Sequence, residues 1–260
     1  MTTESWIFDM VIYVVTFLYG IVIGSFLNVC ILRIPLKENI AKERSHCMHC
    51  GYRLAWYDLI PLFSYIFLGG KCRKCKEHIS LQYPLVEALN GVLYVLIFLV
   101  NGWSIDSVIY CLLTSALIVL SVIDFRTYEI PYGINLFILA LGLIHLLFHL
   151  GDWVDYGIGL LVVSGFLAIL YWLSKGAAIG GGDVKLMGAA GLLLGWKLAI
   201  VAFLSGCILG SVIHLIRMKV SGAENRLAMG PYLAAGILLA VLWGNEFLSW
   251  YLGSFTSPVG

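Results

Sequence analysis

Charged residues are scarce in this sequence. Asp, Glu, Lys and Arg make up only 12% of its 260 residues, whereas 61% are hydrophobic. A soluble domain of this length would carry about 25% charged residues. The composition therefore excludes an ordinary soluble globule and indicates an integral membrane protein. The formal net charge is +1, and no basic helix interleaved with aromatic residues is visible, so nothing in the sequence indicates nucleic-acid binding.

Several other signals are missing from the chain. No Lys or Arg precedes the first apolar run, and no small-residue cleavage site follows it. We therefore expect a retained first span rather than a removed signal peptide. Low-complexity tracts, clear internal repeats and a glycine-rich loop of the Rossmann type are also lacking.

Apolar segments of membrane-spanning character dominate what remains. A spanning helix needs roughly 20 apolar residues. The candidates are residues 11–34, 84–100, 107–123, 132–150, 156–173, 186–194, 199–216 and 231–251. The segment 186–194 is unusually short, and its glycines leave open a tilted or partly buried half-span. The predicted fold class is an all-α polytopic membrane protein with about eight transmembrane helices.

The distribution of Lys and Arg predicts the orientation, because cytoplasmic loops carry an excess of both. With eight spans and the N-terminus outside, the inside loops are 35–83, 124–131, 174–185 and 217–230. All of the 16 basic residues except Lys197 then fall inside, with Arg33 at the inner end of the first span. The loop from about residue 36 to 83 is predicted to be a small cytosolic domain.

Asp124 and Asp183 lie at the ends of two predicted spans, both on the cytosolic side. A carboxylate in a membrane protein is costly and usually functional. Two carboxylates a few ångströms apart share a proton. The ionised one can then activate a water molecule while the protonated one donates to a peptide carbonyl. This placement favours an aspartyl protease, although each aspartate taken alone is equally well explained as a helix cap or a solvated helix end.

Gly180, Gly181 and Gly182 directly precede Asp183. Residues without a Cβ atom permit unusual φ/ψ angles and the close approach of another backbone. We interpret this run as room for an extended substrate strand. Lys185 and Arg126 lie two positions beyond an aspartate, a spacing at which helical residues do not face each other. They are interpreted as interfacial contacts and not as partners of the aspartates.

Four cysteines form two C-x-x-C pairs, Cys47 with Cys50 and Cys72 with Cys75, separated by 21 residues. This spacing is close to that of zinc ribbons, and four thiolates complete a structural Zn²⁺ site. A loop of this size has little core, so a bound metal would supply folding energy. Two disulfides or a thiol-exchange site are the competing interpretation. Cytosolic thiols stay reduced, which favours zinc.

His145 and His149 are spaced i, i+4 on one predicted helix. No acidic third ligand is evident near them in the sequence. We therefore expect a packing or interfacial role for both histidines and not metal binding. Asp106, near another span end, is interpreted as a capping or solvated residue.

Taken together and in order, these motifs resemble those of the bacterial prepilin leader peptidases. These enzymes are bifunctional peptidases and N-methyltransferases of type IV pilus, type II secretion and competence systems. The resemblance covers nearly the whole chain. It rests on Gly24-Ser25-Phe26-Leu27-Asn28-Val29 with Arg33 and Pro35, the two cysteine pairs, Tyr83-Pro84 with Glu87, Asp124 with Ile130-Pro131, Gly180-Gly181-Gly182-Asp183-Val184-Lys185 and Gly230-Pro231-Tyr232-Leu233-Ala234.

The resemblance implies that Asp124 and Asp183 are the catalytic aspartates. The substrate would be a prepilin or pseudopilin, cut at the cytosolic face of the bacterial inner membrane after a glycine that precedes its hydrophobic helix. The same protein would then methylate the new N-terminal residue with S-adenosylmethionine. The implied organisation is a first span (1–35), a zinc-binding domain linked to methyl transfer (36–83) and a transmembrane peptidase domain (84–260). Its partners would be the substrates and the lipid bilayer.

Asn28, Arg33 and Glu87 are the polar candidates for S-adenosylmethionine binding, because charged and amide groups at membrane boundaries require partners. Hydrogen bonds that hold the spans together are an equally good interpretation. Two other classes of protein remain as alternatives. A proton- or ion-coupled transporter would use the aspartates as relay groups, and a thiol–quinone redox protein would carry its cysteine pairs on the outer face.

Overall fold

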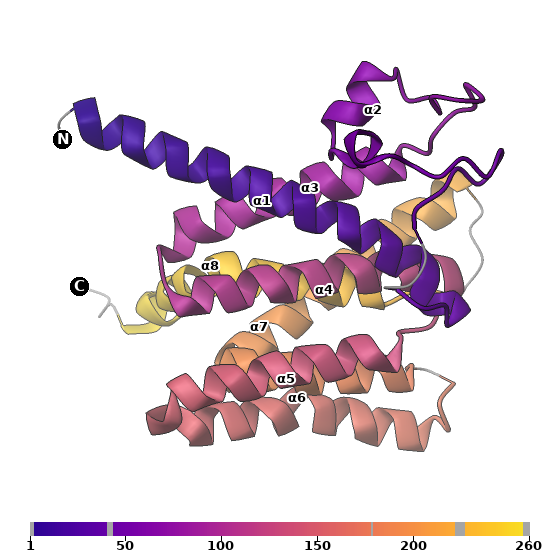
Figure 1. Ribbon diagram of the computed structural model, residues 1–260. Helices are drawn as coiled ribbons and strands as arrows, with labels where there is room; N and C mark the ends of the chain where they lie inside the picture. The colour runs from indigo at the N-terminus through magenta and orange to yellow at the C-terminus, as the bar shows by residue number, and fades with distance from the viewer. Residues whose placement is uncertain (1–2, 41–43, 178, 222–226, 257–260) are drawn as a thin grey trace. The chain divides into compact units, whose positions relative to one another are not determined.

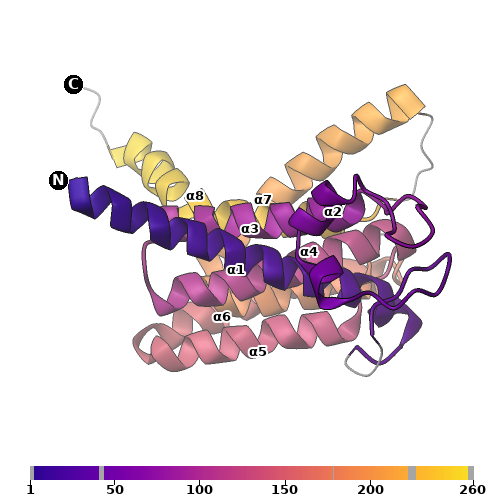
Figure 2. The same ribbon diagram turned by 45° about the horizontal axis from the view of Figure 1, so that its top comes forward.

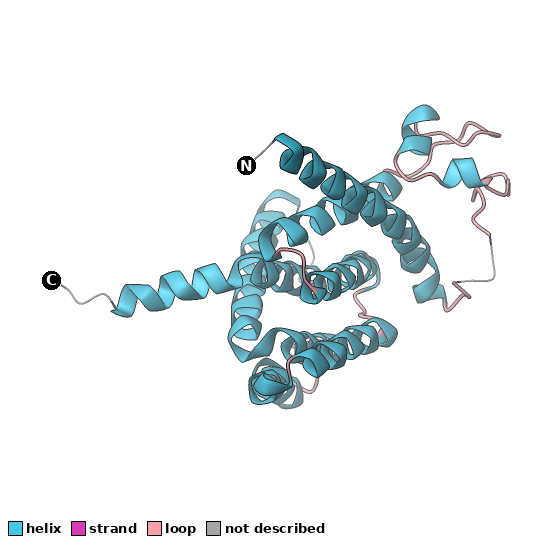
Figure 3. Ribbon diagram, turned by 60° about the vertical axis from the view of Figure 1, so that its left-hand side comes forward, coloured by secondary structure: helices cyan, strands magenta, loops and turns pink. Residues whose placement is uncertain are grey.

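The computed structural model describes residues 3–40, 44–177, 179–221 and 227–256. Within these ranges every regular element is a helix, and the longest stretch without a long helix lies between residues 37 and 81 (Figure 3). Six helices are long and apolar enough to cross a membrane, and a seventh, of 17 residues, is apolar but shorter. The predicted all-α, multi-pass membrane fold is confirmed.

The chain divides into two compact units at Trp103. The first unit, residues 1–103, contains α1 (Thr3–Leu36), η1 (Trp56–Leu59), α2 (Phe63–Phe67) and α3 (Gln82–Asn101). By its contacts α3 therefore groups with α1. The predicted domains, with boundaries at residues 35 and 83, were assigned by activity and not by contacts between helices. This assignment stays a prediction.

Small residues allow α1 and α3 to pack closely. A Cβ atom added to Gly20 would lie 2.7 Å from the Cα of Gly91, so neither position has room for a side chain. At the same point the Asn90 side-chain amide donates a hydrogen bond of 2.7 Å to the Gly20 carbonyl oxygen. Close backbone approach and interhelical hydrogen bonds are the main sources of helix association in a bilayer.

The second unit, residues 104–260, is a bundle of five long helices. The described elements are α4 (Ile105–Thr127), α5 (Tyr132–Phe148), η2 (Leu150–Asp152), α6 (Trp153–Leu173), α7 (Gly181–Ser221) and α8 (Gly230–Thr256). Helix α7 packs against α5, α6 and α8, while α4 packs against α5 and α8 (Figure 1). Helix α7 is thus the central element of this unit.

Gly195 breaks α7 into two helices. Its backbone has φ 76° and ψ 167°, a region that is essentially restricted to glycine. The break is visible as a change of direction in the orange ribbon (Figure 2). Residues 181–194 form the first part, which at 1.5 Å per residue is about 21 Å long. That is shorter than the hydrocarbon core of about 30 Å.

Burial explains how this short segment is tolerated. Its side chains at Leu186, Met187, Ala190 and Leu193 are fully buried inside the bundle. The structure therefore contains a short, buried helical segment at this place, as the sequence left open, and it begins at Gly181 and not at residue 186. The predicted number of about eight transmembrane helices agrees with the eight long helices of the described residues, counted with the two parts of α7 as separate and without the five-residue α2.

Candidate active site and cysteine cluster

Asp124 lies in the last turns of α4, and its side chain is buried with a relative exposure of 4%. The Gly230 backbone N–H donates a hydrogen bond of 2.9 Å to Asp124 Oδ2. Gly230 is the first residue of α8, and the unpaired N–H groups of a helix N-terminus favour an anion there. The packing of α8 on α4 therefore holds this carboxyl group in one orientation.

Asp183 is the third residue of α7 and is 8% exposed. Its backbone N–H bonds the Gly180 carbonyl oxygen at 3.1 Å. Since Asp183 lies within the first turn, it does not precede the helix as an N-cap residue does. A Cβ atom on Gly180 would lie 3.0 Å from Asp183 Oδ2, so the carboxyl group packs directly against this glycine.

The glycine run differs in one respect from the prediction. None of Gly180, Gly181 and Gly182 adopts a positive φ angle, and the last two are the first residues of α7. Unusual backbone angles are therefore not what these glycines supply. They supply close packing, because a Cβ atom on Gly182 would lie 2.9 Å from the Cβ of Ile130.

The fold brings Asp124 and Asp183 together at one end of the second unit. The two carboxyl groups are close enough to interact electrostatically. The loop after α4 packs its Ile130 against Gly182, which ties the two aspartate-bearing segments to each other. Two buried carboxyl groups that interact in this way affect each other's ionisation, which is a precondition for acid–base attack of water on a peptide bond.

Asn135 was not predicted as part of this site. It lies in the first turn of α5, is 4% exposed, and its Nδ2 donates a hydrogen bond of 3.2 Å to the Gly182 carbonyl oxygen. Its Oδ1 is buried without a hydrogen-bond partner in the described part of the chain. No local sequence signal marks an asparagine in an apolar helix as a neighbour of a segment 47 residues away.

Lys185 contacts an aromatic ring, and its predicted interfacial role stays a prediction. Its ammonium group lies 5.3 Å from the ring centroid of Tyr132, a cation–π arrangement.

The four cysteines of the first unit form one cluster. Their sulfur atoms all lie within 4.8 Å of one another, and Cys47 Sγ is 3.8 Å from Cys75 Sγ. Four sulfurs at about 2.3 Å from a tetrahedral metal ion would be about 3.8 Å apart. All seven cysteines are free thiols in the structure. The cluster has the donor type and spacing of a metal site.

The two C-x-x-C pairs form the same backbone turn twice. The Cys47 N–H bonds the Tyr52 carbonyl oxygen and the Gly51 N–H bonds the Cys47 oxygen. Cys72 makes the equivalent bonds with Glu77 and Lys76. Gly51 and Lys76 occupy matching positions with φ 67° and 62°. This short internal repeat was missed in the sequence because only the cysteines recur in it.

Backbone N–H groups favour the thiolate form of one of the four cysteines, Cys72, whereas burial and the neighbouring thiols raise the pKa of Cys75 to about 12. The N–H groups of Cys75 and Lys74 point to Cys72 and lower the pKa of its thiol to about 6. A lowered thiol pKa favours the thiolate, which is the form that binds metals.

Asn28, Arg33 and Glu87 all lie in the first unit and are buried. Asn28 Nδ2 donates to the Tyr83 carbonyl oxygen at 3.1 Å, which links α1 to α3. Arg33 Nη1 bonds the carbonyl oxygens of Asn39 and Ile40. Glu87 Oε2 accepts the Leu62 N–H at 2.8 Å. Each residue therefore has a structural role, and two of them connect the loop 37–81 to the helices.

Asp106, His145 and His149 come together at the other end of the second unit, where their ligand atoms lie within 4.8 Å of one another. The expectation that the two histidines lack an acidic third ligand is wrong. Asp106 belongs to the first turn of α4, and the packing of α4 on α5 places it there.

Comparisons with known proteins agree with the division of the chain. The sequence model of the Bacterial Peptidase A24 N-terminal domain matches residues 18–101. That of the Type IV leader peptidase family matches residues 111–215. No solved structure matches this chain.

Several curated relatives are similar over most of their length. A protein of Aeromonas hydrophila is 33% identical over 92% of this chain and 93% of its own. One of Bacillus subtilis (strain 168) is 32% identical over 92% and 97%, and one of Pseudomonas putida is 32% identical over 87% and 89%. All three carry the name prepilin leader peptidase/N-methyltransferase.

Proposed function

Because this chain belongs to the type IV leader peptidase family, we propose that it cleaves the leader peptides of type IV prepilins or pseudopilins and then methylates the new N-terminal residue. The observation that carries the proposal is the burial of Asp124 and Asp183 at the same end of one helical unit. The similarity to proteins named prepilin leader peptidase/N-methyltransferase, which extends over more than 90% of both chains, supports the same activity.

Cleavage follows from the chemistry of two adjacent carboxyl groups. One carboxylate removes a proton from a water molecule as the oxygen attacks the scissile carbonyl, and the other carboxyl group donates a proton to that carbonyl oxygen or to the leaving nitrogen. The Gly230 N–H fixes Asp124, whereas Gly180 bounds the space beside Asp183. The glycine-lined start of α7 is the surface along which an extended substrate strand would approach.

Conservative replacement of each aspartate tests this mechanism. Asp124→Asn and Asp183→Asn should each abolish prepilin cleavage in membranes, because an amide neither accepts nor donates the transferred proton. Asp152→Asn, which changes an exposed acid of η2, is the control and should leave cleavage unchanged. Full cleavage by both single variants of the pair would exclude the dyad.

Methyl transfer is assigned to S-adenosylmethionine as donor. Glu87 and Arg33 carry charges opposite to those of its sulfonium and carboxylate groups, and within the described ranges no cationic side chain forms an ion pair with Glu87. The donor chemistry of Glu87, Arg33 and Asn28 thus fits this cofactor. When bound, it would supply an electrophilic methyl group, while Glu87 and Arg33 would supply charges that pair with its sulfonium and carboxylate groups.

Mass spectrometry tests methylation directly. Pilin processed in cells by this protein should carry one methyl group on its new N-terminus. The variant Glu87→Gln should yield cleaved but unmethylated pilin. An unmodified N-terminus with the unaltered protein would restrict the function to proteolysis.

We assign a structural Zn²⁺ ion to Cys47, Cys50, Cys72 and Cys75, on the basis of their spacing in the sequence and the clustering of their sulfur atoms. Such an ion would close the loop 37–81 on itself, since this region has few buried apolar side chains. The proposed location is the bacterial inner membrane, with the N-terminus outside and the cysteine cluster and both aspartates on the cytosolic side. Labelling of a single engineered cysteine at Gly151 by a membrane-impermeant maleimide, from outside only, would support this topology.

A further inference from the structure

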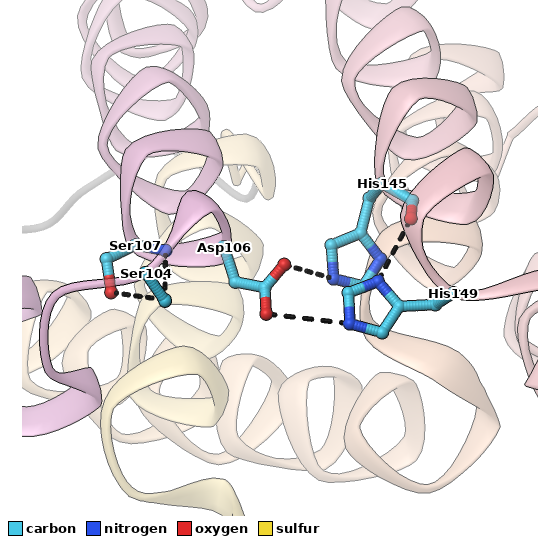
Figure 4. A network of polar contacts seen from close by, with 5 residues as sticks. All are labelled: Ser104, Asp106, Ser107, His145 and His149. Atoms are coloured by element: carbon cyan, nitrogen blue, oxygen red, sulfur yellow. Dashed lines mark hydrogen bonds and ion pairs between the residues drawn. The ribbon is translucent and has the colours of Figure 1, made fainter.

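A second group of metal-ligating side chains lies in the second unit, away from the aspartates. Asp106 comes from the first turn of α4, and His145 and His149 come from the end of α5 (Figure 4). Asp106 and Asp124 are both on α4, 18 positions apart, which corresponds to about 27 Å along the helix. This group is therefore separate from the proposed peptidase site.

The distances within the group are within reach of ion pairs but longer than charged hydrogen bonds. Asp106 Oδ1 is 3.4 Å from His145 Nε2, and Asp106 Oδ2 is 3.6 Å from His149 Nε2. Direct charged N–H···O hydrogen bonds are about 2.7–2.9 Å long. Nitrogen and oxygen ligands at about 2.0–2.2 Å from a tetrahedral ion would be about 3.3–3.6 Å apart. The observed separations match ligands that share an ion.

The hydrogen bonding of His149 orients a lone pair toward Asp106. His149 Nδ1 lies 3.1 Å from the His145 carbonyl oxygen. A carbonyl oxygen only accepts hydrogen bonds, so Nδ1 carries the proton and the Nε2 of a neutral ring presents its lone pair to the carboxylate. Two acceptors then face each other, and a cation between them resolves the conflict. A backbone carbonyl that fixes the tautomer is the usual outer partner of a metal-bound histidine.

The rings of His145 and His149 are stacked, so that both can contact one ligand. Their centroids are 4.3 Å apart with an interplanar angle of 19°, and the Tyr156 ring stands edge-on to His145 at 5.2 Å. Two protonated imidazoles stacked in this way would repel each other, which opposes a site that relies on protons alone. The three side chains differ in their exposure to solvent. That of His145 is 3% exposed, whereas those of Asp106 and His149 are 32% and 31% exposed. The site is anchored on one side and open to solvent on the other.

We propose that Asp106, His145 and His149 bind a divalent transition-metal ion of the Zn²⁺ type. Two imidazoles and one carboxylate suit Zn²⁺, Ni²⁺ or Cu²⁺, whereas Mg²⁺ and Ca²⁺ prefer all-oxygen sites. Three protein ligands leave a fourth position for water. The ion would join the beginning of α4 to the end of α5 at the end of the bundle opposite the aspartates. Its role would be to stabilise the second unit, because a ligand that binds only the folded state raises stability.

Metal content separates this site from the cysteine cluster. The full-length protein, purified in detergent without a polyhistidine tag and equilibrated with Zn²⁺, should contain two zinc ions per chain by mass spectrometry of the digested sample. Cys47→Ser with Cys72→Ser should retain one, and its zinc absorption edge should show nitrogen and oxygen ligands only. Adding Asp106→Asn and His149→Gln to that variant should remove the remaining ion.

Control variants distinguish specific coordination by these three residues from adventitious zinc binding. Asp152→Asn changes an acid at the same end of the unit outside the group and should keep both ions. Zn²⁺, but not Mg²⁺, should raise the melting temperature of the cysteine variant, and this shift should disappear with Asp106→Asn. A cysteine variant free of zinc, or one whose zinc survives both substitutions in the group, would overturn the proposal. Equal loss in Asp152→Asn would show adventitious binding only and would overturn it as well.

Discussion

At the scale of single residues, glycines fix the space around both aspartates. Gly230 contacts Asp124 and Gly180 contacts Asp183, and in each case an added Cβ atom would come within 3.0 Å of a carboxylate oxygen. Gly230 in addition donates its N–H to Asp124. The sequence motif that begins α8 is thus explained by a contact made across the bundle with α4.

The variant Gly230→Ala tests this contact. It keeps the backbone N–H but places a methyl group 2.7 Å from Asp124 Oδ2, so the carboxyl group must move. Misplacement of a reacting group by about 1 Å can cost roughly 100-fold in rate, and we expect a loss of that order in prepilin cleavage. Gly253→Ala on the same helix, where a Cβ atom meets nothing within 4 Å, should cleave normally. Equal activity of both variants would contradict the assignment.

The two cysteine turns predict opposite effects of two substitutions. Gly51 and Lys76 both have a left-handed backbone, which costs a residue with a side chain about 1–2 kcal/mol. Gly51→Ala should therefore weaken the cluster and Lys76→Gly should strengthen it. We expect zinc release to a chromogenic chelator to become about 5-fold faster in the first variant and slower in the second, since about 1 kcal/mol corresponds to a factor of about 5. Changes in the same direction would refute the equivalence of the turns.

At the scale of elements, the division of α7 is the feature that shapes the second unit. Gly195 ends the first part with a conformation that other residues rarely adopt. Nearby, Gly191 of α7 and Gly159 of α6 are so close that a Cβ atom on either would clash with the backbone of the other. The buried half-span with Asp183 at its start is therefore positioned by glycines at both of its ends.

Replacement of Gly195 should disturb this element. Gly195→Ala forces a side chain into a region that costs of order 1–3 kcal/mol, and it favours continuation of the helix. We expect a lower melting temperature and reduced prepilin cleavage. Gly165→Ala in α6, where a Cβ atom meets nothing within 4 Å, should raise stability by about 0.5–1 kcal/mol because glycine is unfavourable within helices. A melting temperature for Gly195→Ala at or above that of the unaltered protein would show that the break tolerates a side chain.

At the scale of the whole molecule, the two proposed activities draw on different units. The cysteine cluster and the residues Asn28, Arg33 and Glu87 all belong to residues 1–103, whereas both aspartates belong to residues 104–260. One family model matches residues within the first unit, and the other matches residues within the second. Loss of one set of residues is therefore expected to affect one activity more than the other.

Metal removal should separate the activities. A strong zinc chelator, or Cys47→Ser with Cys72→Ser, should abolish N-terminal methylation because the loop 37–81 loses its metal. Cleavage should persist, since Asp124 and its Gly230 partner are held by helices α4 and α8. Mass spectrometry of processed pilin measures both outcomes in one sample. Loss of cleavage in parallel with methylation would show that the units are not independent.

The sequence by itself determined the membrane class, the approximate spans and the identity of the main candidates. These features are local, because a spanning helix requires a continuous apolar run and a zinc ligand pair requires cysteines at close spacing. Asp124, Asp183 and the four cysteines could be selected for this reason. The short segment before Gly195 could also be recognised as unusual, since its length alone is too small for a span.

Only the tertiary structure decided which distant residues meet. The hydrogen bond from Gly230 to Asp124 spans 106 positions of sequence, and the contact of Asn135 with Gly182 spans 47. Asp106 joins His145 and His149 only because α4 packs against α5. Such contacts depend on helix packing, and in a bilayer this is set by close-fitting small residues, whose partners cannot be assigned from the local pattern of one segment.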